Sequence, residues 1–151
     1  MTKCYLLAVL ALVPAGCGGG GGDKQGKTLY TAAGWTITLD QGKPTLYHYV
    51  GNKWVVDRSR AVEIEILGPK PNKVAPNPPQ IAIAMHSKQP LIEYATWIDD
   101  LRIFEKGGGS PTNYTIYGAP ANPLDPGTHV AVGYARTAFG GTVVAWRFRV
   151  P

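Results

Sequence analysis

The sequence predicts an all-β protein: an antiparallel β-sandwich with an N-terminal strand meander that packs on it or completes it. Apolar residues recur at every second position in several short segments, which is the period of a strand with one buried face. Turn-forming residues separate these segments, and the chain contains 19 glycines and 13 prolines in 151 residues. No window of about ten residues or more shows a helical period. Short strands joined by tight turns therefore favour antiparallel sheets.

Residues 1–16 are predicted to be an export signal. Lys3 precedes a short apolar run, Tyr5–Val13, and small residues end the segment. The run is about half as long as a membrane-spanning helix needs to be. A basic start, a short apolar core and a small-residue end are typical of a cleaved signal peptide rather than an anchoring helix.

Cys17 directly follows Ala15 and Gly16, and this ending resembles the lipobox of bacterial lipoproteins. The resemblance implies that Cys17 becomes the lipidated first residue of the mature chain and holds it at a membrane. Pro14 stands where such boxes usually carry leucine. Cleavage by ordinary signal peptidase after Ala15 is the alternative, and it would leave Cys17 as a lone thiol.

Residues 17–27 are predicted to be a flexible tether. Gly18–Gly22 has no side chains to bury and the most backbone entropy to lose on ordering. Under the lipobox interpretation the folded part lies in the cell envelope, on the extracytoplasmic side. Gly18, rather than aspartate, follows the cysteine, and by similarity to lipoprotein sorting in diderm bacteria this permits transfer to the outer membrane.

Residues 28–67 are predicted to form the meander. Trp35, Ile37 and Leu39 alternate with polar residues and are expected to share a buried face. A stretch of about forty residues is small for an independent core, so we expect it to pack on the rest of the chain. Further strands are expected at 47–50, 54–57 and 62–66, with turns at 41–44 and 51–52.

Residues 68–79 are predicted to be a connector. Five prolines in this stretch remove five backbone donors, which excludes a central strand and favours an extended, polyproline-like path. The connector either links the meander to a separate sandwich or crosses within one sandwich.

Residues 80–151 are predicted to form the sandwich itself. The clearest alternation is in Ile81–Met85, Val130–Tyr134 and Val144–Val150. Further strands are expected at 91–98, 101–104 and 113–117, with turns at 107–111, 126–127 and 140–141.

Motifs in this half carry a resemblance to a known family. Pro123–His129 leads into an alternating strand, and a glycine turn then leads into Trp146–Val150. These segments resemble the last two strands of bacterial immunoglobulin-like and fibronectin type III-like domains, and Pro78–Ile83 is similar to their proline-led first strand. Val130 stands where fibronectin-like modules often have a buried tyrosine. The resemblance implies an immunoglobulin-like sandwich that acts as an extracytoplasmic adhesive or spacer module.

The charge pattern argues against a nucleic-acid-binding protein, and the cysteine content argues against a disulfide-stabilised one. The formal net charge is +5, but the basic residues are scattered along the chain, so no nucleic-acid surface is expected. Both cysteines lie at or before position 17, so the folded part has no disulfide. Its stability has to come from packing and strand pairing.

No catalytic residues, metal site or cofactor are predicted. His48, His86 and His129 have no second potential ligand two or four positions further along the chain, so a zinc site would need distant strands. No serine lies in a Gly-x-Ser-x-Gly turn. Asp99-Asp100 is expected to form a hairpin turn rather than a calcium site. The protein is therefore not expected to be an enzyme.

The candidate ligand-binding residues are Tyr47, Tyr49 and Trp54. Exposed rings on a strand can stack on sugars or anchor a protein. Tyr47 and Tyr49 share a face, so we expect both to be buried or both exposed, whereas Trp35 is expected to be in the core.

These observations predict a binding or spacer module of the cell envelope. Its expected partners are the membrane, through Cys17, and an envelope protein or polysaccharide. Two alternatives remain: a carbohydrate-binding module that uses the three aromatic rings, and a lipoprotein component of an envelope assembly.

Overall fold

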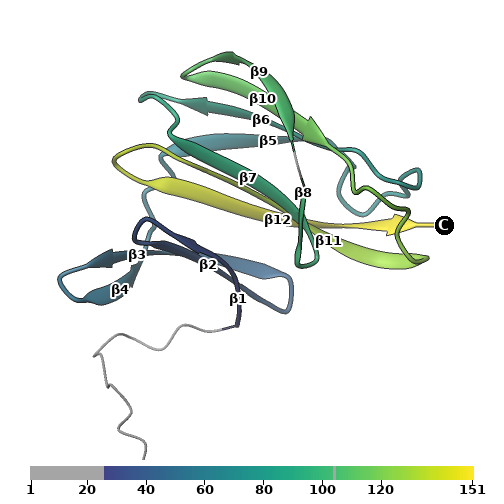
Figure 1. Cartoon of the computed structure of the whole chain (residues 1–151), viewed down its shortest axis with the longest axis horizontal. Coiled ribbons are helices and arrows are strands. Elements are labelled where there is room, and N and C mark those ends of the chain that lie inside the picture. The colour runs from purple at the N-terminus through teal and green to yellow at the C-terminus, as the bar shows by residue number, and fades with distance from the viewer. Residues whose placement is uncertain (1–25, 104) are drawn as a thin grey trace, which may run out of the picture.

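Figure 1 shows the computed structural model, which describes residues 26–103 and 105–151. The predicted signal peptide, Cys17 and nearly all of the predicted tether lie outside these residues. The described chain is all-β, as predicted, with twelve strands in three four-stranded antiparallel sheets. No helix in it has the length and apolarity to cross a membrane. The strands are β1 (Lys27–Ala32), β2 (Trp35–Asp40), β3 (Lys43–Val50), β4 (Lys53–Val56), β5 (Val62–Gly68), β6 (Ile81–Ser87), β7 (Glu93–Ile98), β8 (Leu101–Ile103), β9 (Lys106–Ser110), β10 (Asn113–Gly118), β11 (Gly127–Arg136) and β12 (Gly141–Val150).

The order of the strands identifies an immunoglobulin-like sandwich. We call β1-β2-β3-β4 the meander sheet, β5-β6-β10-β9 the distal sheet and β12-β11-β7-β8 the central sheet. Lettered in chain order from β5 as A, B, C, C′, D, E, F and G, the distal sheet reads A-B-E-D and the central sheet G-F-C-C′. This is the immunoglobulin-like arrangement of two packed antiparallel sheets. The predicted sandwich is therefore confirmed.

The three sheets form three layers, with the central sheet between the other two (Figure 1). Alternate residues of β11 point to opposite faces: Ala131 and Ala135 pack in the sandwich core, whereas Val132 and Tyr134 pack against the meander sheet. The central sheet is thus buried on both faces, and the meander packs on the sandwich rather than completing it. The meander side of this contact contains Trp35, Ile37 and Leu46, and the sandwich core contains Ile81, Ile83, Met85, Ile98, Ile116, Trp146 and Phe148.

The structure places β5 in the sandwich, although the sequence grouped residues 62–67 with the meander. β5 pairs with β6 along the edge of the distal sheet, with Ile64 opposite Met85 and Ile66 opposite Ile83. The chain leaves the meander sheet after β4, so the passage to the sandwich is residues 57–61. Alternation marks a strand and its buried face, but it does not say which strand will be its neighbour.

The connector crosses within one sandwich, which is the second of the two predicted paths. It runs along the edge of β12: the Asn72 N–H donates to the Arg147 carbonyl at 2.7 Å, and the Arg149 N–H donates to the Lys73 carbonyl at 2.9 Å. The Trp146 Nε1–H donates to the Pro69 carbonyl at 2.8 Å. The prolines thus lie beside a sheet edge and not in the middle of a ladder.

The prediction of a turn at 107–111 was wrong, because the glycines of this segment form strand β9. A β-carbon on Gly107 would lie 2.6 Å from the Thr115 carbonyl oxygen, and one on Gly109 would lie 2.1 Å from that of Asn113. Gly109 also has a φ of +140°, which favours glycine. The glycines therefore allow β9 to approach β10, and the chain reverses at Pro111 and Thr112.

Candidate functional site

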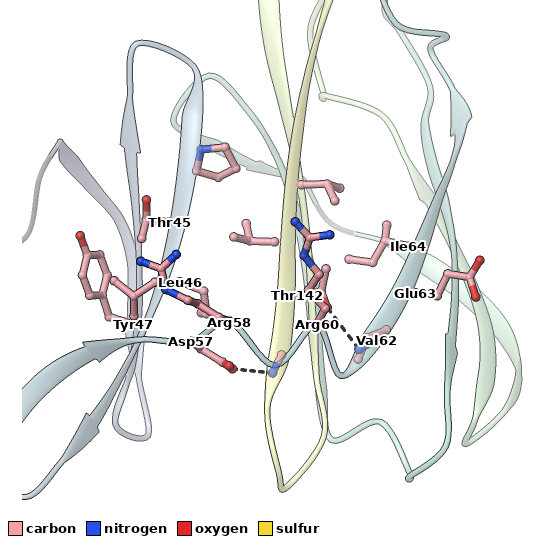
Figure 2. Close-up of a pocket in the computed structure, with 15 residues that line it drawn as sticks. Thr45, Leu46, Tyr47, Asp57, Arg58, Arg60, Val62, Glu63, Ile64 and Thr142 are labelled. Atoms are coloured by element: carbon pink, nitrogen blue, oxygen red, sulfur yellow. Dashed lines mark hydrogen bonds between the residues drawn. The ribbon is translucent and has the colours of Figure 1, made fainter.

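A groove of about 1040 Å³ runs along the edge of the central sheet. Its floor is β12, one wall is β3 of the meander sheet and the other wall is β5 of the distal sheet (Figure 2). The groove exists because β12 is an edge strand in the middle layer, and the two outer layers extend on both sides of it.

Apolar side chains line both walls and the floor. Successive residues of β12 point to opposite faces, so Val143 packs toward the meander sheet and Val144 toward the sandwich core. Leu46 stands on the meander wall and Ile64 on the β5 wall.

Asp57 closes one end of the groove by capping the start of β12. Its Oδ2 accepts the Gly141 N–H at 2.8 Å, and its Oδ1 accepts the Ser59 N–H at 2.8 Å. The Asp57 N–H donates to the Leu46 carbonyl at 2.8 Å. A β-carbon on Gly140 would lie 2.1 Å from the Ser59 Oγ, so glycine is needed where residues 57–61 pass this hairpin. No pattern in the sequence singles out Asp57.

Two arginines on the same crossing segment line the groove. Arg58 and Arg60 are exposed, and neither has an ion pair or hydrogen bond with another described residue. Asp57 is engaged by two backbone N–H groups, and the Glu63 carboxylate points away from the groove (Figure 2). The groove therefore contains two guanidinium groups that form no ion pair with a described residue, and the Asp57 carboxylate, held by backbone N–H groups, adds one negative charge at the same end.

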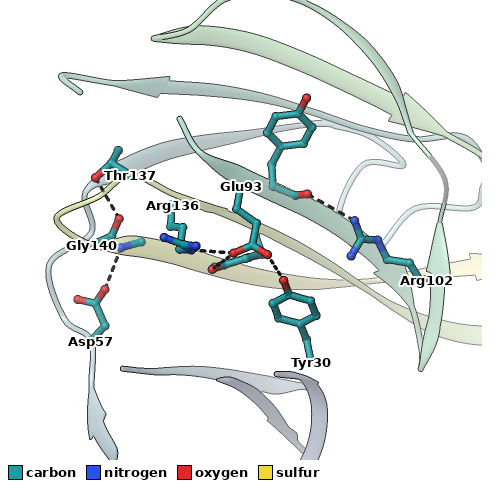
Figure 3. Close-up of polar contacts among 10 residues, drawn as sticks. Tyr30, Asp57, Glu93, Arg102, Arg136, Thr137 and Gly140 are labelled. Carbon is teal, nitrogen blue, oxygen red and sulfur yellow. Dashed lines mark hydrogen bonds and ion pairs between the residues drawn. The ribbon is translucent and has the colours of Figure 1, made fainter. Parts of the chain in front are cut away.

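A polar cluster centred on Glu93 of β7 ties the meander sheet to the sandwich (Figure 3). The carboxylate accepts hydrogen bonds from the Tyr30 hydroxyl, from the Tyr134 hydroxyl at 3.2 Å and from the Arg136 Nε at 2.7 Å. Burial raises the pKa of Tyr134, and the negative charge of Glu93 raises it further, so this hydroxyl stays protonated and donates. Because both carboxylate oxygens already have donors, the cluster is a structural connection.

The three candidate aromatic residues do not form one platform. Tyr47 and Tyr49 share a face of β3, but Tyr47 is 8% exposed and Tyr49 is 47% exposed, so the expectation that both would be alike was wrong. Tyr47 lies in mid-strand beside Thr36 and Val56, whereas Tyr49 lies near the end of the β3–β4 hairpin. Tyr49 and Trp54 form a ring pair with centroids 5.1 Å apart. Tyr47 instead lines the groove.

Trp35 is buried, as predicted, and is only 4% exposed. Its ring stacks on that of His48 at 4.0 Å, and the Arg136 guanidinium lies 5.5 Å from its centroid. This residue joins β2 and β3 to the central sheet.

The histidines lie in separate environments. His86 Nδ1 is 2.6 Å from Asn113 Oδ1, and His129 contacts Asp99 and the backbone of Asp125. Within the part of the chain that the structure describes, no three histidine, cysteine, aspartate or glutamate side chains come together as a metal site.

His129 should make stability depend on pH. Burial lowers its pKa, but the hydrogen bonds and negative charge of Asp99 and Asp125 outweigh this effect, and the net pKa is raised. The contribution is fully present below the unfolded pKa of about 6.5 and is lost as pH rises through the higher folded value. Urea unfolding from about pH 5.5 to 8 should therefore show a fall in the stability of the wild type relative to His129→Gln. A constant difference between the two proteins across this range would contradict the assignment.

Comparisons with known proteins find structural likeness only. No family model matches the chain, and no curated protein matches its sequence. The methionine-rich copper resistance protein PcoC from Escherichia coli shares 16% identity with a TM-score of 0.37, over 59% of this chain and 99% of that one. A chain of the titin M10–obscurin-like 1 Ig complex shares 16% identity with a TM-score of 0.38, over 60% and 95%. Likeness this distant carries no argument about function, and the fold assignment rests on the strand order above.

Proposed function

We propose that this protein is a binding module of the cell envelope, exported by its leader, anchored through a lipid on Cys17, and not an enzyme. The groove along β12 is the observation that carries the binding function, because it is walled, has both apolar and polar lining, and contains two arginines without acidic partners among the described residues. Concave sites that combine apolar surface with a few placed polar groups are the usual form of a binding site.

The order of segments supports the proposed location. A signal-like leader, Cys17 and a glycine run precede β1, which begins at Lys27. Cys17 lies ten positions before the first strand. A segment of this length between the anchor and β1 would separate the folded part from the membrane surface.

Mass spectrometry of the mature N-terminus tests the anchor. We expect a diacylated or triacylated Cys17, and we expect Cys17→Ala to move the protein from the membrane fraction to the soluble fraction. An unmodified chain that begins at Gly16 would show cleavage after Ala15 and would refute lipidation.

The pair formed by Tyr49 and Trp54 favours a second candidate function, carbohydrate binding. Its two rings lie next to each other at the end of a hairpin, and Tyr49 is well exposed. If this function is correct, the protein should be retained on an immobilised envelope polysaccharide, and Tyr49→Ala should abolish retention while Phe139→Ala, at another exposed ring, should not.

A further inference from the structure

We propose that the groove binds an extended, acidic segment of another protein, which pairs its backbone with β12 as an added strand. This inference rests on the proposed binding function and specifies its mode and the chemistry of the partner. It follows from the backbone of β12, the shape of the groove and its charge.

Alternate residues of β12 direct their backbone groups to opposite sides. The backbone groups of Arg147 and Arg149 hydrogen-bond to the connector, and the Gly141 N–H donates to Asp57. The backbone N–H and C=O groups of the odd-numbered residues therefore point away from β11. β11 and β12 pair without a register shift, so Val143 and Ala145 face the same way. Their N–H and C=O groups have no partner among the described residues, and a sheet edge of this kind is a template for another strand.

Both ends of this open stretch are already occupied. Asp57 caps one end at Gly141, and the connector pairs with the other end from Arg147 onward. Val74 of the connector forms a parallel bridge with Arg149, so this edge already accepts a strand from within the chain. At about 3.3 Å per residue, the interval between the two caps accommodates about five residues of an extended chain.

The walls determine which side chains fit. An added strand would point alternate side chains toward the meander wall, near Leu46, and toward the β5 wall, near Ile64. Arg58 and Arg60 would lie beside it where residues 57–61 cross. The best occupant therefore has small apolar side chains in the middle and carboxylates near its end, where they can form charge-assisted hydrogen bonds with the arginines.

A second folded copy of this chain is a poorer occupant. Its own β12 lies at the bottom of the same groove, so the walls of the two molecules would meet before their edges could pair. A single extended segment can enter where a folded sheet edge cannot. We therefore commit to a flexible segment of a different protein.

The test uses two fluorescein-labelled peptides and the full-length protein in detergent micelles. Each peptide has about seven residues of alternating valine and threonine, with glutamates at both ends in one and lysines at both ends in the other. Fluorescence polarisation should show binding of the glutamate peptide and at least about tenfold weaker binding of the lysine peptide. Failure of both peptides to bind would overturn the proposal.

Charge reversal tests the role of the arginines. Arg58→Glu with Arg60→Glu should weaken binding of the glutamate peptide at least about tenfold and should strengthen binding of the lysine peptide. The matched control is Lys53→Glu with Lys106→Glu, at two exposed positions outside the groove, which should change either affinity by less than about twofold. Equal loss in both double variants would reveal attraction to net charge alone and would overturn the proposal.

Amide hydrogen exchange tests strand addition directly. The glutamate peptide should slow exchange at Val143 and Ala145, and Ala145→Pro, which removes one outward donor and leaves the β11 ladder intact, should abolish binding. Circular dichroism and urea unfolding would check that the proline variant is folded. Binding without protection of these two amides would refute the added strand.

The two proposals fail in different ways. If an envelope partner is captured equally by the wild type, by Ala145→Pro and by the charge-reversed variant, the binding function holds and the strand-addition site is wrong. If Cys17 is unmodified and the protein is not in the envelope, the proposed location is wrong, and the peptide assay still reports on the groove.

Discussion

Trp35→Ala is expected to lower the free energy of unfolding by about 3–5 kcal/mol, the usual range for removing a large buried aromatic side chain. Trp35 is 4% exposed and packs in the contact between the meander sheet and the central sheet. Its removal would leave a cavity and would also remove the stacking on His48 and the contact with the Arg136 guanidinium. Urea unfolding followed by far-ultraviolet circular dichroism measures the loss.

Phe139→Ala is the matched control for this prediction. Phe139 is 78% exposed in the β11–β12 hairpin, and substitutions at such positions usually change stability by no more than about 0.5 kcal/mol. If Trp35→Ala proved as neutral as Phe139→Ala, the meander sheet would not be held to the sandwich as described.

Glu93→Gln is expected to cost about 1.5–3 kcal/mol, because it removes the charged acceptor of three hydrogen bonds. The Glu93 side chain is 22% exposed and that of Arg136 is 13% exposed. Hydrogen bonds to water can therefore only partly replace those that the carboxylate accepted. The amide keeps one acceptor oxygen and brings an N–H₂ group toward donors.

A double-mutant cycle with Arg136→Gln separates the ion pair from the other contacts of Glu93. The coupling energy between the two positions should be clearly different from zero, because neighbouring charged partners are not additive. Glu65→Gln, on an exposed face of β5, serves as the control and should be neutral within about 0.5 kcal/mol. A coupling energy of zero would mean that Arg136 finds an equivalent partner in solvent.

Several strands could be read from alternation because the period of two residues is a local property. Trp35 and Ile37 in β2, Ile81 and Ile83 in β6, and Phe148 in β12 are buried as their pattern predicted. Thr36 and Thr38, on the opposite face of β2, are also buried, at 0% and 1% exposed. β2 lies between β1 and β3, so side chains on both neighbouring strands flank these threonines: Thr31 and Tyr47 lie beside Thr36, and Thr28 and Thr45 lie beside Thr38.

The segment Gly107–Gly109 shows where local reasoning fails. Glycines have no side chains that could alternate, and their usual position is a turn. They form a strand here because β10 provides a partner and because the close approach leaves no room for a β-carbon.

No pattern in the sequence indicated the candidate groove either. Residues 57–61 have no strand pattern, so Arg58 and Arg60 looked like ordinary surface charges. The outward backbone groups of Val143 and Ala145 are identified as unpaired among the described residues only when the neighbours of β12 are known. Among the predicted aromatic residues, Tyr47 alone lies at this groove.

Local patterns were sufficient to predict an antiparallel all-β chain, the buried faces of its clearest strands and a proline-rich connector that is not a central strand. Tertiary structure alone assigned β5 to the sandwich, placed the central sheet between two others and separated the environments of Tyr47 and Tyr49. The physical reason is that side-chain alternation depends on adjacent residues, whereas strand neighbours and layer order depend on contacts between segments far apart in the chain.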